Sequence, residues 1–133
     1  LFYDSTNLDF IYRHPNVTTA GAWRTGGTMN TVRRRVAGAG SQTAALAISG
    51  TADPPLYAQV ESYNGASWTE IADVNTAREE HSAAGTQTAA LAYGGYPNVN
   101  TSVHYDGTNW TAVNSLNVCL ASSWSNVVYA VTL

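Results

Sequence analysis

The stretch GTQTAALAYGG, residues 85–95, has the composition of a helix, because Ala and Leu are the strongest helix formers. It nevertheless repeats GSQTAALAISG, residues 40–50, almost letter for letter. The longer segments 30–50 and 75–95 share 12 identities in 21 positions without a gap. Because each copy of an internal repeat is expected to form the same structural unit, the repeat is stronger evidence for the structure than local helix propensity.

A second pair of matching segments gives the length of the unit. SYNGASW at residues 62–68 reappears as HYDGTNW at residues 104–110. The tryptophans that mark successive units are 45 and then 42 residues apart, at Trp23, Trp68 and Trp110. One unit is therefore about 43 to 45 residues long, which is the length of one blade in several repeat families.

Turn residues divide the better formed unit into four short segments. Gly, Pro-Asn and Asp-Gly separate residues 81–86, 89–95, 101–107 and 109–115, which predicts four strands per unit. Asn64-Gly65 and Asp106-Gly107 predict tight hairpin turns between the last two strands, because both residue pairs accept positive φ angles. The stretch at 85–95 is bounded by Gly at both ends and is too short for a stable helix, so we expect it to be a buried strand.

Side-chain size rises along each unit. The first two segments hold Ala, Gly, Ser and one leucine, Leu46 or Leu91, whereas the last two carry the large aromatic side chains of Tyr63, Trp68, Tyr105 and Trp110. This gradient suits radially stacked sheets, whose inner strands lie closer to the neighbouring sheet than their outer strands do. It favours propeller blades; a flat β-sandwich is the alternative.

The segment AREEHSAAGTQTAALAYGG followed by YDGTNW resembles a kelch repeat. The matching residues of this unit are Arg78, His81, Gly94, Gly95, Tyr105 and Trp110. Those of the preceding unit are Arg33, Gly50, Tyr63 and Trp68, with Val36 in place of the histidine and Ser49 in place of the first glycine. The compact form is similar to repeats in phage and environmental bacterial proteins. The resemblance implies an all-β fold of four-stranded antiparallel blades, in which these motif residues are architectural.

The repeat boundaries predict a partial blade at 1–32, full blades at 33–74 and 75–116, and a partial blade at 117–133. Residues 23–30 are expected to form an outermost strand. Because propellers typically need four to eight blades, this chain would hold an incomplete ring. We therefore expect either that copies assemble, with residues 125–133 completing a blade against residues 8–13 and Trp23 of a neighbour, or that the chain is a segment of a longer propeller.

Composition excludes several classes of function. Of the 133 residues 44% are hydrophobic and only 11% are charged, and the net charge is −3, which argues against nucleic acid as a partner. The sequence has no run of 18 apolar residues, so it predicts no membrane-spanning segment. The one cysteine, Cys119, and the three histidines, His14, His81 and His104, lie on different segments, so neither a metal nor another cofactor is expected.

Acidic residues offer no obvious catalytic pair. Glu61 and Glu70 are predicted on separate strands, while Asp73 and Asp106 are predicted at turns, so we do not expect an enzyme. The only basic cluster is the run Arg33-Arg34-Arg35, and the next unit has Glu79 and Glu80 where the first has Arg34 and Arg35. This reversal predicts ion pairs between neighbouring blades, with anion binding or a solvated surface as alternatives. In a strand, Arg34 and Arg35 would point in opposite directions.

Two loops after the second strand of each unit are candidates for ligand contact. They span residues 51–58 and 96–101, and the candidate residues are Tyr57, Tyr96, Asn98 and Asn100. Tyrosine beside amide side chains suits sugar recognition by stacking and hydrogen bonding, although turn formation by Pro and Asn explains the same residues.

The function expected from these observations is that of a non-enzymatic structural or interaction module in an extracellular or virion assembly, of the tail-fibre or decoration type. Its partners would be copies of itself, other subunits of the assembly, or cell-surface glycans bound during adhesion. The alternatives are a lectin-like carbohydrate-binding propeller and a fragment of a larger secreted propeller enzyme.

Overall fold

The computed structural model describes residues 2–4, 9–11, 25–97 and 99–117. Within these residues the chain forms ten strands and no helix. The strands are β1 (Phe2–Asp4), β2 (Asp9–Ile11), β3 (Ala37–Ser41), β4 (Ala44–Thr51), β5 (Leu56–Tyr63), β6 (Trp68–Ile71), β7 (Ser82–Thr86), β8 (Ala89–Tyr93), β9 (Ser102–Tyr105) and β10 (Trp110–Val113).

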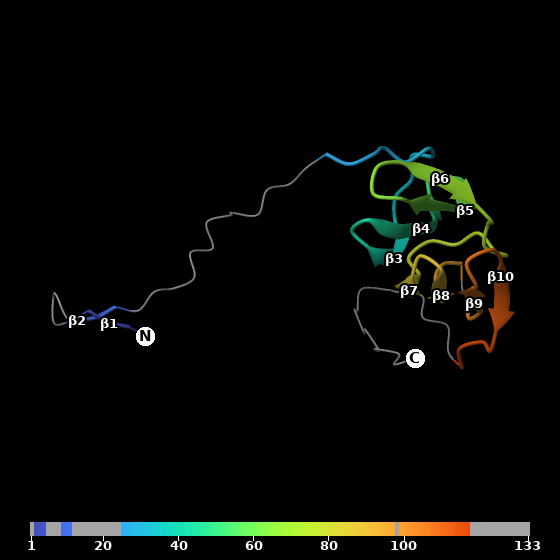
Figure 1. Cartoon of the computed structure of the whole chain (residues 1–133). Helices are drawn as coiled ribbons and strands as arrows, with labels where there is room; N and C mark the ends of the chain where they lie inside the picture. Colours follow the sequence, from blue (N-terminus) through green and yellow to red (C-terminus); the bar gives the residue numbers. More distant parts are fainter. Residues whose placement is uncertain (1, 5–8, 12–24, 98, 118–133) are drawn as a thin grey trace.

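The repeat appears as two four-stranded antiparallel sheets (Figure 1). The N-terminal sheet has the order β3-β4-β5-β6 and lies within residues 33–74; the C-terminal sheet has the order β7-β8-β9-β10 and lies within residues 75–116. Strands β1 and β2 pair with each other. The prediction of an all-β fold with blade-like units of four antiparallel strands is confirmed, and the two sheets do not close into a ring.

The stretch at 85–95 is not a helix, but the prediction of one strand is wrong in its first four residues. Gly85 and Thr86 end β7, Gln87 and Thr88 form a turn, and the second strand of the sheet begins at Ala89. Gly85 has φ +122°, and a Cβ atom there would lie 2.3 Å from the carbonyl oxygen of Ala89. Only glycine fits so close to the returning strand, and Gly40 occupies the same place in the N-terminal sheet.

The turns between the last two strands are held by a side chain rather than by two residues of positive φ. The Oδ1 atom of Asn64 accepts hydrogen bonds from the backbone N–H groups of Ala66 (3.0 Å) and Ser67 (2.9 Å). Only the glycine of the pair, Gly65, has a positive φ, at +93°. The predicted two-residue turn is therefore a longer loop closed by an Asx-type bond, and Asp106 closes the equivalent loop in the same way.

The two sheets stack face to face. The face that the N-terminal sheet uses in this contact does not correspond, by the repeat, to the face that the C-terminal sheet uses. Paired residues in a sheet share a face, so Leu46, Ile48 and Val60 lie on one side of the N-terminal sheet. They form one buried cluster with a row from the C-terminal sheet: Ala90, Ala92, Val103, Tyr105 and Trp110. By the repeat, this row corresponds to the opposite face of the N-terminal sheet, the face that carries Tyr63 and Trp68. The stacking is therefore head to tail.

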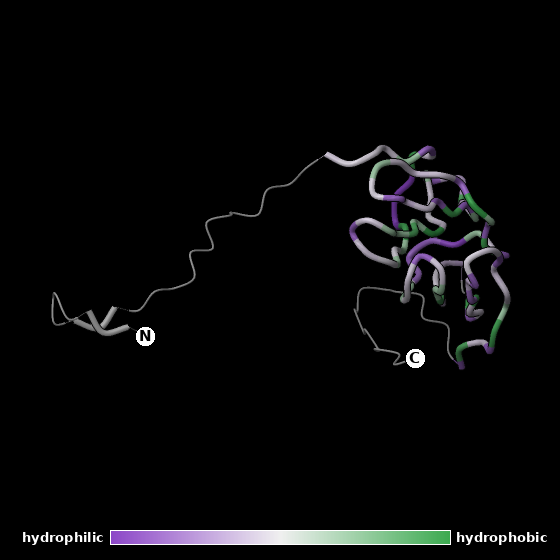
Figure 2. Tube along the Cα trace, viewed as in Figure 1, coloured by the Kyte–Doolittle hydropathy of each residue, from purple (hydrophilic) through white to green (hydrophobic). Residues whose placement is uncertain are grey.

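Hydropathy follows this alternation. Figure 2 shows hydrophobic and hydrophilic stretches interleaved through both sheets rather than one long apolar segment. Ile48, Val60 and Ala92 of the cluster are fully buried. Residues next to each of them in its strand face the other side of the sheet. Each sheet thus has two distinct faces, one of which is covered by the other sheet.

Residues 25–33 lead into the N-terminal sheet and differ from expectation. No strand forms at 25–30, where an outermost strand is predicted. A strand needs a neighbouring strand to pair with, whereas Gly27 lies against the backbone of Ala66 and accepts a hydrogen bond from the indole of Trp68. Trp23, residues 125–133 and, apart from β2, residues 8–13 lie outside the described residues, so the predicted closure between copies stays a prediction.

Candidate interaction surfaces

The motif arginine of each unit is buried beneath its sheet. Arg78 is fully buried, and its guanidinium donates hydrogen bonds to the carbonyl oxygens of Gly94 (3.3 Å) and Thr101 (3.0 Å) and to Oγ1 of Thr101 (3.1 Å). Burial lowers the pKa of Arg78. The side chain ties the end of β8 to the segment that leads into β9, which is an architectural role.

Arg33 occupies the same place in the N-terminal sheet but has a carboxylate beside it. Its Nη1 atom lies 3.1 Å from Oε1 of Glu61, and both side chains are fully buried. Burial lowers the pKa of Arg33, and the charge of Glu61 opposes this shift. Glu61 also accepts backbone hydrogen bonds from Asn30 (2.7 Å) and Thr31 (3.2 Å). The carboxylate therefore fixes the incoming segment against the sheet.

Glu61 and Glu70 are closer than their separate strands suggested. They are direct cross-strand partners on β5 and β6 and share one face of the sheet, so the expectation that they lie apart is wrong. Sequence alone does not give strand register, and register places them side by side. Both oxygens of Glu61 are already engaged by Arg33, Asn30 and Thr31, which assigns this carboxylate to structure.

His81 is the buried histidine of the second repeat unit. Burial, and then the charge of Arg78, lowers its pKa to about 4, so the ring is neutral near pH 7. Neither ring nitrogen has a hydrogen-bond partner in the part of the chain that the structure describes. Among the described residues no group of three or more His, Cys, Asp or Glu side chains could hold a metal ion. Cys119 and His14 lie outside those residues.

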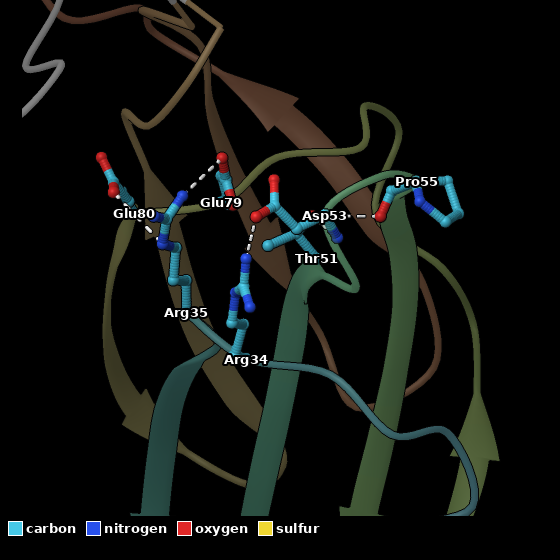
Figure 3. A network of polar contacts seen from close by, with 7 residues as sticks. All are labelled: Arg34, Arg35, Thr51, Asp53, Pro55, Glu79 and Glu80. Atoms are coloured by element: carbon cyan, nitrogen blue, oxygen red, sulfur yellow. Dashed lines mark hydrogen bonds and ion pairs between the residues drawn. The ribbon is translucent and has the colours of Figure 1, made fainter.

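Arginines and carboxylates form a polar network at one end of the contact between the sheets (Figure 3). Arg35 lies 3.1 Å from Oε1 of Glu79 and 3.5 Å from Oε1 of Glu80, so the predicted ion pairs between units are confirmed for Arg35. Arg34 pairs instead with Asp53, in the loop between β4 and β5 of its own unit. The side chains do not alternate as in a strand, because Arg35 has φ +56° and bends the chain.

The candidate ligand residues do not form one loop cluster. Tyr57 lies inside β5, paired with Gly50, and its side chain is half-buried rather than on a loop. Tyr96 is 51% exposed and forms an isolated bridge with Glu79, and Asn100 is exposed. Asn98 lies outside the described residues. The structure describes no contact between the rings of Tyr57 and Tyr96.

Each sheet has an aromatic pair where its third strand ends and its fourth strand begins. The ring centroids of Tyr63 and Trp68 are 4.9 Å apart, and those of Tyr105 and Trp110 are 5.0 Å apart. Tyr105 and Trp110 are buried between the sheets, whereas Trp68 is only half-buried. The pair of the C-terminal sheet therefore fills a contact that the pair of the N-terminal sheet lacks among the described strands.

The outer face of the N-terminal sheet is hollowed where the covered face of the C-terminal sheet is filled. A hollow of about 470 Å³ lies over β3 and β4, with Met29 and Trp68 at its border. Its floor carries small residues, including Gly38, Gly40, Ala45 and Ala47. The sequence analysis explained these small residues by the limited room between the inner strands of neighbouring blades, but it did not predict that one face is open. Because the two repeats are nearly identical, the sequence does not show which faces are covered.

Gln87 makes a contact between the two sheets that was not predicted from the sequence. From the β7–β8 turn its Nε2 atom donates to Oγ of Ser62 (2.8 Å) and to the carbonyl oxygens of Tyr63 (2.5 Å) and Ala45 (3.4 Å). One side chain thus links the turn of the C-terminal sheet to two strands of the N-terminal sheet. The sequence feature that indicated this contact is the glutamine at the same place in both repeats, Gln42 and Gln87. The turn itself does not require a glutamine, so its repetition indicates another role.

No protein-family model matches the sequence, and no curated protein is significantly similar to it. The described part of the chain also has no helix of the length and apolar character needed to cross a bilayer.

Proposed function

We propose that this chain is a non-enzymatic interaction module, built of kelch-like propeller blades, that works by stacking its sheets against those of neighbouring subunits. The observation that carries the proposal is the asymmetric use of the sheet faces. Each sheet has two faces suited to stacking, but within the described residues each packs against the other sheet on one face only.

The two outer faces keep part of the apolar chemistry of the covered ones, while Glu61 and Glu70 also lie on the outer face of the N-terminal sheet. The outer face of the N-terminal sheet has its open hollow beside Trp68 and Met29. The outer face of the C-terminal sheet carries Leu91 and Tyr93, which are half-buried, and Val113, which is 42% exposed. Exposed apolar patches of this kind are typical of protein–protein contacts. They support a structural role in an assembly, and the resemblance to phage-type repeats favours an extracellular or virion assembly.

The buried polar groups support the non-enzymatic part of the proposal. Arg33, Glu61 and Arg78 are engaged in contacts that hold the sheets, and His81 is neutral and enclosed. A catalytic group must reach its substrate, and these four side chains are buried.

Light scattering during size-exclusion chromatography of the full chain tests the proposal. We expect a particle larger than one chain, with a mass that falls on dilution or remains fixed if a closed ring forms. A cooperatively folded monomer over the whole concentration range would overturn the proposal.

A lectin-like role is the second candidate, favoured by the exposed ring of Tyr96 beside the exposed Asn100. A glycan array with the wild-type chain and the Tyr96→Ala variant tests it. Binding that is lost in the variant supports the role, and absence of glycan binding removes it. Tyr57→Ala is the matched control, because Tyr57 lies within β5.

A further inference from the structure

The geometry points to a second copy of this chain as the occupant of the outer faces, docked by the same contacts that join the two sheets within one copy. This inference rests on the proposed stacking function. In it, the outer face of the C-terminal sheet of one copy packs onto the hollowed outer face of the N-terminal sheet of the next copy.

Apolar packing within one copy shows what this docking requires. Leu46, which is 2% exposed, projects from the N-terminal sheet into the cluster that contains Ala90 and Ala92 of the C-terminal sheet. The repeat places Leu91 where Leu46 is, and Ala45 and Ala47 where Ala90 and Ala92 are. Leu91 lies on the outer face of the C-terminal sheet, and Ala45 and Ala47 lie in the floor of the hollow. A neighbouring copy therefore offers the side chain that fits the hollow.

The hollow has room for that side chain. Among the described residues, a Cβ atom added at Gly38 would meet only the carbonyl oxygen of Leu46, at 3.7 Å, so they leave the space above this part of β3 open. A volume of about 470 Å³ exceeds that of one leucine side chain and admits part of its strand. The corresponding space on the C-terminal sheet is filled by the sheet contact within the copy.

The glutamine contact can be repeated between copies. Gln87 binds Oγ of Ser62 and the carbonyl oxygens of Ala45 and Tyr63 across the sheet contact. Its counterpart, Gln42, is exposed at the β3–β4 turn of the N-terminal sheet. The counterparts of its targets lie on the C-terminal sheet, at the carbonyl oxygens of Ala90 and Tyr105 and at the exposed side chain of His104. In the docked pair, Gln42 of one copy reaches these groups of the other.

The charges at the contact are reversed between the two units. They are therefore attractive both between the sheets of one copy and between neighbouring copies. Within one copy, Arg35 of the first unit faces Glu79 and Glu80 of the second. Between copies, Glu80 takes the place of Arg35, and Arg34 and Arg35 take the places of Glu79 and Glu80. Two identical units would bring like charges together at every one of these contacts. The pattern in this chain gives opposite charges at every contact of a head-to-tail series.

Cross-linking between single-cysteine copies tests the docking. In a Cys119→Ser background, which removes the only native thiol, a Gln42→Cys copy is mixed with a His104→Cys copy and treated with a short bis-maleimide. We expect a covalent dimer in the mixture. The positive control is a single chain with Gln87→Cys and Ser62→Cys, whose native side chains are 2.8 Å apart, and it should link internally.

The negative control replaces the His104→Cys copy by a Ser67→Cys copy, because Ser67 lies in the exposed loop between β5 and β6 and not on the outer face of the C-terminal sheet. An assembly that light scattering detects, but in which the thiols introduced at Gln42 and His104 do not link, overturns the docking while the stacking function stands. A monomer in solution overturns both.

A second variant tests the face independently of the thiols. Leu91→Glu places a charge on the outer face and should weaken association about tenfold or more, because the docked interface would bury that charge. Circular dichroism and cooperative unfolding report whether the variant still folds. Unchanged association of a folded Leu91→Glu chain overturns the docking, and Ser67→Glu is the matched control.

Discussion

The N-terminal and C-terminal sheets have the same strand order but bury their motif arginine in different ways. Arg33 lies against the buried carboxylate of Glu61, whereas Arg78 is satisfied by the carbonyl oxygens of Gly94 and Thr101 and the hydroxyl of Thr101. The residue that corresponds to Glu61 in the C-terminal sheet is Val103, which packs in the apolar core.

This difference shows what the motif position requires. The five N–H groups of a guanidinium must find acceptors, and the charge needs no carboxylate if enough carbonyl oxygens are near. Where Glu61 supplies acceptors, it also binds the backbone of Asn30 and Thr31 and so anchors the segment that precedes the sheet.

The largest effect is expected for Glu61→Gln. The substitution leaves the Arg33 charge buried without its carboxylate, and breaking a buried ion pair in this way costs roughly 3 to 5 kcal/mol of the free energy of unfolding. Urea denaturation measures the change. Glu70→Gln, on the exposed cross-strand partner, is the control and should shift stability by less than about 0.5 kcal/mol. Equal effects at the two positions would contradict the assigned role of Glu61.

The aromatic pairs give the next comparison. Trp110 is 7% exposed and Trp68 is half-buried, so Trp110→Ala should cost roughly 3 to 5 kcal/mol and Trp68→Ala clearly less. Thermal or chemical unfolding of the two variants decides the order. If neighbouring copies cover Trp68 as proposed, the cost of Trp68→Ala should increase with protein concentration, while that of Trp110→Ala should not.

His81 should make stability depend on pH. Its pKa is about 4 in the folded chain and 6.5 in the unfolded chain, so between these values the unfolded state binds more protons. The free energy of unfolding is therefore highest above pH 6.5 and falls as the pH decreases towards 4, by up to roughly 3 kcal/mol from this group. His81→Val, which copies Val36 of the first unit, should flatten that part of the curve. An unchanged slope in the variant would assign the dependence to other groups.

The smallest effect is expected at the irregular point of β4. Ser49 has φ +52° and is fully buried, and its hydroxyl has no hydrogen-bond partner among the described residues, whereas Gly94 stands at the same place in the C-terminal sheet. Ser49→Gly should raise the free energy of unfolding by about 1 kcal/mol, because glycine adopts a positive φ without the Cβ penalty. Gly94→Ser should lower it. A loss of stability in Ser49→Gly would show that the side chain contributes packing that outweighs the backbone strain.

Repeat length, strand number and blade-like sheets follow from the sequence because two copies of the same pattern limit the possible structures. The turn signals at Gly65 and Gly107 place the loops, and the opposed charges of Arg35 and Glu79 predict a contact between units. These inferences use features that recur or complement one another along the chain, and the structure bears them out.

Register and burial could not be derived in the same way. The side-by-side placement of Glu61 and Glu70 depends on which residues pair across β5 and β6, and a shift of one residue would separate them. Tyr57 was expected on a loop because Pro54 and Pro55 precede it, but β5 begins immediately after them at Leu56. The role of Gln87 depends on how two sheets stack, and local sequence carries no record of that geometry.

Because the sheets stack head to tail, the two ends of the stack present different faces. Further whole units could therefore be added by the same stacking. A third unit inserted between Val74 and Asn75 would present one face to each existing sheet, and each junction would repeat a contact already present. In such an array, stability grows with the number of junctions and the end units unfold first. A three-unit chain is therefore expected to melt at a higher temperature than this one, and the added unit should be the part most protected from hydrogen exchange.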